Sequence, residues 1–112
     1  MSYKLFLDDI REPEDISLYR GFTDDFWDDV EIARSYAEAI KLLRRKGLPD
    51  VLMLDYHLGD PEHSGFDVVK YFISMVERNP EDLPKNFKYY IHTDSPKGCE
   101  IMEKALEKLL TS

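Results

Sequence analysis

The sequence has almost no cysteine, since Cys99 is the only one in its 112 residues. A single cysteine excludes an internal disulfide and is typical of proteins that work in a reducing compartment. Cys99 falls in a segment where apolar residues recur at helical spacing, which favours a small buried side chain over a catalytic thiol. We therefore expect a cytoplasmic protein whose stability comes from an apolar core.

Long apolar runs are also missing. A membrane span needs about 20 consecutive apolar residues, and no segment of the sequence approaches that length. The N-terminal apolar stretch becomes acidic at Asp8, which makes it too short for a signal peptide. We expect neither a membrane span nor a secretion signal.

Basic side chains are outnumbered, with 15 Lys and Arg against 23 Asp and Glu and a formal net charge of −8. Binding to duplex nucleic acid or to an anionic membrane requires a basic patch. We therefore expect neither as a partner. A bound divalent cation could still bring a single phosphate group to an acidic pocket.

What the sequence does contain is the composition of one globular domain. Hydrophobic residues make up 43% and charged residues 34% of the chain, and a chain of this length can bury a core without disulfide or metal. No repeat, low-complexity tract or linker divides it. We expect a single domain over residues 1–112 that is a monomer or weak dimer.

Segments typical of strands alternate with segments typical of helices. Strands are expected at residues 3–7, 30–33, 51–54 and 88–91. Helices are expected after Ser35, where Glu38 completes a capping box, after Ser64, and from Pro96 onward. The mixed pattern of residues 10–29 indicates either a short irregular helix or a long loop anchored by aromatic residues. The alternation predicts an α/β fold with three α/β/α layers and a four-stranded parallel sheet.

Polar side chains follow three of the four expected strands. Asp8 and Asp9 follow the first, Asp55 the third, and His92 and Thr93 the fourth. The carboxyl ends of parallel strands share one edge of the sheet, where ligands bind in open α/β folds. Either acidic group alone is compatible with an exposed turn, but three carboxylates brought together repel unless a cation intervenes. Such oxygen ligands suit Mg²⁺ or Mn²⁺, so the sequence predicts an acidic metal pocket that handles a phosphate group.

Histidines near these strand ends are further candidates. His92 is placed for proton transfer or phosphate contact, and its alternative is a hydrogen bond to the backbone at the strand end. His57, two residues after Asp55, either contributes to the site or has no function there. We expect His63 to be exposed.

The Asp8–Asp9 pair, the strand that ends in Asp55, and the hydroxyl of Thr93 together resemble the receiver domains of two-component response regulators. The resemblance implies a flavodoxin-like receiver fold in which the acidic pair binds Mg²⁺, Asp55 accepts a phosphoryl group from a phosphodonor protein, and Thr93 contacts that group. Receivers have a fifth strand that ends in a lysine, whereas this sequence predicts a truncated fold without it. Lys97 could take the place of that lysine.

A closer resemblance is to cyclic-phosphate-processing receivers. Residues 7–13 (LDDIREP) are similar to that family's LDDxRxP, residues 54–59 (LDYHLG) to LDHDLG, and residues 91–98 (IHTDSPKG) to IHSxNPxG. The resemblance implies metal-assisted work on a cyclic phosphate, a small phosphate-containing molecule, and Arg11 and Ser95 become secondary site candidates. Tyr56, His57 and Ser95 depart from the family's histidine, aspartate and asparagine.

Three hypotheses follow. The first is a metal-dependent cyclic phosphodiesterase with metal on Asp8, Asp9 and Asp55 and with His92 as general acid or base. The second is a signalling receiver that is phosphorylated on Asp55. The third is a catalytically silent binding module.

Overall fold

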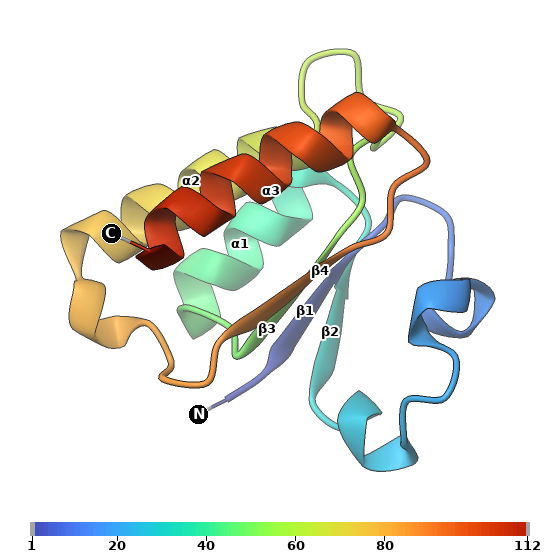
Figure 1. Ribbon diagram of the computed structural model, residues 1–112, viewed down its shortest axis with the longest axis horizontal. Coiled ribbons are helices and arrows are strands. Elements are labelled where there is room, and N and C mark those ends of the chain that lie inside the picture. The colour runs from blue at the N-terminus through green and yellow to red at the C-terminus, as the bar shows by residue number, and fades with distance from the viewer. Residues whose placement is uncertain (1, 112) are drawn as a thin grey trace.

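The four apolar segments expected as strands form one sheet. The computed structural model describes residues 2–111, and its strands are β1 (Lys4–Leu7), β2 (Val30–Ala33), β3 (Val51–Leu54) and β4 (Lys88–Ile91). They lie in the order β2-β1-β3-β4, and all three pairings are parallel (Figure 1). The predicted four-stranded parallel sheet is confirmed.

Three α-helices cover one face of this sheet: α1 (Tyr36–Lys46), α2 (Gly65–Arg78) and α3 (Pro96–Thr111) (Figure 1). The side chain of Ser35 caps α1 by accepting from the backbone N–H of Glu38. The Glu38 carboxylate, however, accepts from the backbone N–H of Arg34, so the expected capping box is only half formed. At α2 the box is complete, because the Asp67 side chain reaches back to the N–H of Ser64.

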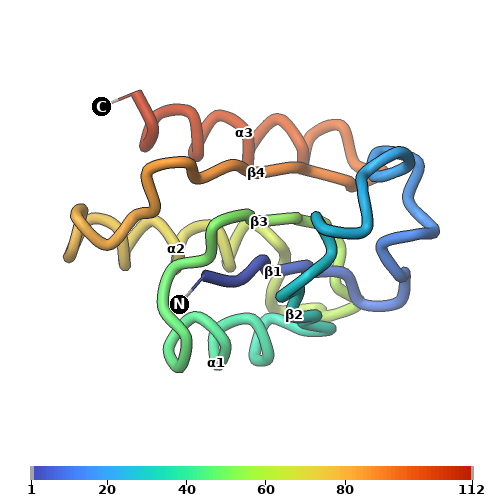
Figure 2. The backbone as a smooth tube through the Cα atoms, turned by 90° about the horizontal axis from the view of Figure 1, so that it is seen from below, coloured from blue at the N-terminus to red at the C-terminus, as the bar shows by residue number. Residues whose placement is uncertain are grey.

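The other face is covered by residues 8–29, which form three short 3-10 helices: η1 (Pro13–Asp15), η2 (Ser17–Tyr19) and η3 (Asp24–Trp27). Figure 2 shows this segment to one side of the strands, away from α1 and α2. Its aromatic side chains pack against the face of the sheet that lies away from the α-helices and hold the segment in place. The receiver-like three-layer fold is therefore confirmed, with one layer built from 3-10 turns in place of α-helices.

Alternation along the strands divides the core into two parts. Leu5 and Leu7 of β1 face the α-helices, whereas Phe6 faces the 3-10 segment. All four residues of β3 are buried, because both faces of this central strand are covered. This burial on both faces fixes the register of β1 and β3, and with it the positions of the residues that follow them.

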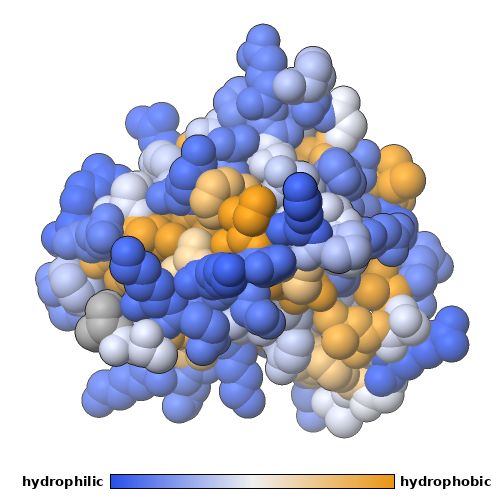
Figure 3. Space-filling model, turned by 45° about the horizontal axis from the view of Figure 1, so that its top comes forward, coloured by the Kyte–Doolittle hydropathy of each residue, from blue (hydrophilic) through white to orange (hydrophobic). Residues whose placement is uncertain are grey.

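Figure 3 shows mostly hydrophilic residues on the visible surface, with apolar residues gathered in a few patches. The large apolar side chains that remain exposed are those of Ile10, Leu18, Ile32, Ile101 and Leu110. Among residues 2–111, no helix combines the length and the apolar character that crossing a membrane requires.

Candidate functional site

The structure brings Asp8, Asp9 and Asp55 together at the carboxyl edge of the sheet. Asp8 follows β1 and Asp55 follows β3, and the last residues of these neighbouring strands are paired, Leu7 with Leu54. Each of the three carboxylates offers an oxygen, and these oxygens lie within 4.8 Å of one another. Asp8 is fully buried, Asp55 is 6% exposed and Asp9 is half-buried. The expected convergence of acidic groups is therefore present.

Asp8 is fixed by the turn that it opens. Its Oδ1 accepts hydrogen bonds from the backbone N–H groups of Ile10 at 3.0 Å and Arg11 at 2.8 Å. Its Oδ2 accepts from Nε of Arg11 at 3.0 Å. These bonds satisfy a buried carboxylate and direct the chain away from the sheet.

Arg11 supplies the positive charge between the carboxylates. Besides its bond to Asp8, its Nη2 lies 3.6 Å from Oδ2 of Asp55 and donates to the backbone carbonyl of His92 at 3.0 Å. Partial burial would lower the pKa of Arg11, but the carboxylates of Asp8 and Asp55 outweigh it and raise that pKa. The guanidinium thus links the ends of β1, β3 and β4.

Arg34, which sequence reasoning missed, holds this turn from the other side. Its Nη1 donates to the backbone carbonyls of Asp8 at 3.2 Å and Arg11 at 2.6 Å, and its Nη2 pairs with Glu12 at 2.6 Å. Arg34 directly follows β2, so it occupies the same kind of strand-end position that identified the other candidates. Its position directly after a strand is therefore the feature of the sequence that could have identified Arg34 as a site residue.

The imidazole of His92 is completely buried behind Asp8. Its Nδ1 lies 2.7 Å from the hydroxyl of Tyr19, and Phe6 stacks on the ring at 4.9 Å. Its Nε2 lies 3.3 Å from Oδ2 of Asp8 but has no hydrogen-bond partner among residues 2–111. Burial lowers the pKa of His92 to about 4, although the Asp8 carboxylate opposes the shift.

The positions of these groups determine which of them donates. Nε2 of the neutral His92 faces the Asp8 carboxylate, which can only accept, so we assign the imidazole proton to Nε2. Nδ1 then accepts from the Tyr19 hydroxyl, which stays protonated because burial raises the pKa of Tyr19. The predicted role of His92 as a general acid or base stays a prediction, and Tyr19 joins the site as a residue that sequence reasoning missed.

Asp55 and Thr93 form the other side of the site. Asp55 accepts from the backbone N–H of Tyr56 at 2.8 Å, and the Thr93 hydroxyl lies near its carboxylate. Burial and the neighbouring Asp8 raise the pKa of Asp55, whereas the Tyr56 N–H, the Thr93 hydroxyl and Arg11 oppose the shift. A nearby cation would favour the charged form of this carboxylate and so oppose the raised pKa.

The remaining candidates lie outside this network. His57 is exposed, and its ring makes an edge contact with the ring of Tyr56. The Ser95 hydroxyl caps the first turn of α3 by accepting from the N–H of Gly98 at 3.0 Å. Lys97 is exposed. Within residues 2–111, no hydrogen bond or ion pair joins these three side chains to the carboxylates.

His63 keeps 38% of its side-chain surface exposed, as expected. Its ring also stacks on Tyr36 at 4.0 Å and lies 3.3 Å from the Asp60 carboxylate.

The donor set fits a hard divalent cation. Carboxylate oxygens are the ligands that Mg²⁺ and Mn²⁺ prefer, and no hydrogen bond engages the Asp9 carboxylate among residues 2–111. Gly59 lies against Asp9 with a φ of 68°, and a Cβ there would stand 3.1 Å from its Oδ2. Arg11 offsets one of the three negative charges, and a divalent cation would offset the other two.

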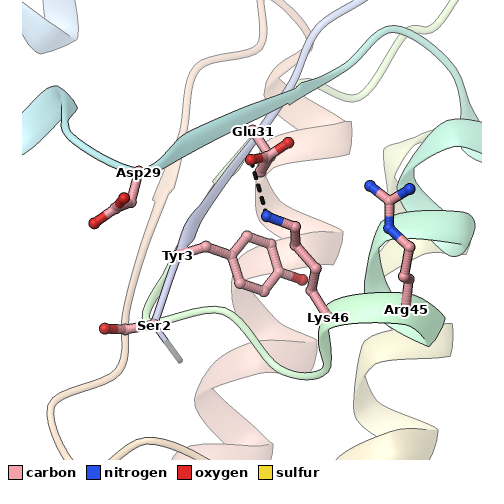
Figure 4. Close-up of a pocket in the computed structure, with 6 residues that line it drawn as sticks. All are labelled: Ser2, Tyr3, Asp29, Glu31, Arg45 and Lys46. Atoms are coloured by element: carbon pink, nitrogen blue, oxygen red, sulfur yellow. Dashed lines mark hydrogen bonds and ion pairs between the residues drawn. The ribbon is translucent and has the colours of Figure 1, made fainter.

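A cavity of about 430 Å³ opens beside this site and is lined in part by Arg11, His92 and Thr93. A separate cavity of about 620 Å³ lies at the opposite, amino ends of β1 and β2 (Figure 4). There the Lys46 ammonium is paired with Glu31 at 3.0 Å, and the Tyr3 hydroxyl donates to the Gly47 carbonyl. Because its lysine and glutamate neutralise each other, the acidic edge is the better candidate site.

The chain was compared with solved structures, curated protein sequences and family models, and the family model identifies its family. A solved structure described as a yeast Spc42 trimeric coiled-coil segment fused to another structure is similar, with 17% identity over 99% of this chain and 85% of that chain and a TM-score of 0.49. No curated protein sequence matches the chain. The family model for the cyclic-phosphate processing receiver domain matches residues 3–108, which include every candidate described above. The chain therefore belongs to the cyclic-phosphate processing receiver domain family.

Proposed function

We propose that this receiver-like domain binds a divalent metal ion at Asp8, Asp9 and Asp55 and processes a cyclic phosphodiester. The observation that carries the proposal is the approach of the three carboxylates to within 4.8 Å, beside Arg11 and Thr93. Buried carboxylates at this spacing repel one another, and a cation relieves that repulsion. The small molecule expected as substrate contains a phosphate group.

Mg²⁺ is the expected ion, with Mn²⁺ as an alternative. When bound, such an ion polarises a phosphoryl oxygen and lowers the pKa of water that it coordinates. Asp9 and Asp55 offer the less engaged oxygens, because Asp8 already accepts three hydrogen bonds. We therefore expect Asp9 and Asp55 to contribute most to metal affinity.

The other side chains take supporting roles in this proposal. Arg11 neutralises negative charge on a phosphate held near Asp55, and the Thr93 hydroxyl contacts the same group. His92 acts through Asp8, because its imidazole is buried and its Nε2 faces that carboxylate. In this role it positions a metal ligand, and proton transfer by His92 would require the ring to be reached through Asp8.

One observation favours a second candidate function, phosphorylation of Asp55. The Thr93 hydroxyl lies near the Asp55 carboxylate, as a contact with a phosphoryl group on Asp55 would require. The cation beside Asp55 is Arg11, at 3.6 Å, in place of a lysine. A phosphodonor protein would be the partner in that case, and a silent binding module is the third alternative. The cytoplasmic location stays a prediction.

The test combines turnover with intact mass. Purified chain is incubated with Mg²⁺ or Mn²⁺ and a panel of cyclic nucleotides, and separately with acetyl phosphate. We expect metal-dependent ring opening that Asp55→Asn reduces at least a hundredfold, whereas the matched control Asp82→Asn, an exposed carboxylate in η4 (Pro80–Asp82), keeps full activity.

Other outcomes separate the alternatives. A stable phosphoryl adduct after acetyl phosphate, absent in Asp55→Asn and without turnover, would assign the chain to the phosphorylated receivers. Neither turnover nor adduct would leave the binding module.

A further inference from the structure

Two cavities open side by side on the 3-10 layer, and Arg20 lines both. The first, of about 430 Å³, is lined by Arg11 and Thr93, which also border the carboxylate site, so the cavity lies beside that site. The second, of about 400 Å³, is lined by the aromatic side chains of Phe22 and Trp27, with Glu14 and Asp24 at its acidic part, which suits the uncharged base end of a ligand. A ligand that entered both would place one end at the carboxylates and the other against aromatic rings.

The guanidinium of Arg20 has no assigned task inside the fold. Its side chain is exposed and makes no hydrogen bond or ion pair with any group in residues 2–111, while its backbone N–H is held by the carbonyl of Ser17 at 3.1 Å. The local backbone thus positions the residue, but the charge is left free between the cavities. An arginine in this state is suited to a bidentate contact with an anion.

Charges in the first cavity determine what it accepts. Asp15 and Asp94 line it together with Arg11 and Arg20, so the acidic and basic side chains balance. A phosphate group would therefore enter favourably only with a cation at the neighbouring carboxylates. This couples occupation of the cavity to metal binding.

The aromatic wall of the second cavity is held in place by packing. Phe22 and Trp27 lie at 29° to one another with centroids 6.0 Å apart, and Phe22 packs edge-on against Tyr19 and Tyr90 at 5.6 Å and 5.5 Å. Phe22 and Trp27 are only half-buried. Aromatic rings that are fixed by packing and still partly exposed suit contact with a flat heterocycle.

We propose that the two cavities together bind a nucleoside phosphate, with its phosphate in the first, its base on Phe22 and Trp27, and Arg20 between them. The assignment rests on the proposed function of the carboxylate site, because that site holds the phosphate end. A free mononucleotide is favoured over the end of a nucleic acid strand, since a net charge of −8 repels a polyanion.

The test compares ligands that differ only in the base. Adenosine cyclic monophosphate and an analogue with a methyl group in place of adenine are titrated into the full chain with Mg²⁺. Trp27 is the only tryptophan, so its fluorescence reports contact at the second cavity. We expect the nucleotide to bind about tenfold more tightly or better, because one stacked base contributes about that factor, and to quench Trp27.

Two arginine variants test whether Arg20 contributes to the tighter binding of the nucleotide. Arg20→Gln should remove most of the nucleotide's advantage, whereas the matched control Arg44→Gln, an exposed arginine on α1, should keep it. Equal binding of nucleotide and base-free analogue would overturn the aromatic subsite and leave the proposed function standing. If neither ligand binds in the presence of Mg²⁺, both the aromatic subsite and the proposed function are overturned.

A short single-stranded oligonucleotide ending in the same phosphate forms the last arm. Weaker binding than the mononucleotide is expected. Tighter binding would overturn the mononucleotide assignment in favour of a strand end.

Discussion

Gly65 shows how tightly the site is built around Asp55. A Cβ added at Gly65 would overlap the backbone carbonyl oxygen of Asp55, and the N–H of Gly65 donates to the carbonyl of Tyr56 at 2.7 Å. We predict that Gly65→Ala lowers the free energy of unfolding by about 1–3 kcal/mol, because backbone must move to admit the methyl group.

Urea denaturation measures this loss, and Gly98→Ala is the comparison. A Cβ at Gly98 would overlap Cγ of Tyr56 and stand 2.8 Å from its Cβ, and rotation of the side chain cannot move that Cβ aside, so a loss of similar size is expected. An unfolding midpoint for Gly65→Ala equal to that of the parent chain would contradict the packing described here.

His92 should make stability depend on pH. Its pKa is about 4 in the folded chain and near 6.5 when unfolded, so the unfolded chain takes up a proton first as the pH falls. We predict that the stabilisation is complete above pH 6.5 and declines as the pH falls from 6.5 to 4, by on the order of 3 kcal/mol in total.

The comparison is the pH profile of urea unfolding for the parent and for His92→Gln in metal-free buffer. Asp55, whose raised pKa contributes with the opposite sign, is present in both proteins and cancels. Parallel profiles between pH 4 and 6.5 would show that His92 is not buried in its neutral form.

At the scale of elements, the 3-10 layer supports the site through Tyr19. Tyr19→Phe removes the hydroxyl that donates to Nδ1 of His92 and leaves that buried nitrogen unpaired. We predict a loss of about 1–3 kcal/mol in the free energy of unfolding.

Tyr90→Phe is the matched control, since Tyr90 lies in the same aromatic cluster and its hydroxyl has no hydrogen bond among residues 2–111. Equal stability of the two variants, measured by urea denaturation, would remove Tyr19 from the support of the site.

Elements differ in how far the sequence predicts them. The strands and the three α-helices were predictable because their apolar residues follow a period and Ser35, Ser64 and Pro96 mark the helix starts. The aromatic anchoring of residues 10–29 was also predictable, but the positions of their 3-10 turns were not, because scattered aromatic residues have no period that indicates where each turn begins.

The candidate site divides in the same way. Asp8, Asp9 and Asp55 were predictable because strand ends in a parallel sheet must meet. The partnership of Tyr19 with His92 spans 73 residues of sequence and begins in the aperiodic segment, so only the folded chain reveals it.

At the scale of the whole molecule, the fold concentrates negative charge where it is least screened. The chain has a net charge of −8, and three of its carboxylates converge at one edge of the sheet with Arg11 as their cation. Folding therefore brings like charges together, and in the proposed function a divalent ion at this edge relieves their repulsion.

Calorimetric titration of Mg²⁺ into the metal-free chain tests whether these carboxylates bind a divalent ion. We predict one saturable site that Asp9→Asn and Asp55→Asn each weaken at least tenfold, while Asp82→Asn binds like the parent chain. Absence of saturable binding, or equal affinities in all four proteins, would contradict the metal site and with it the proposed function.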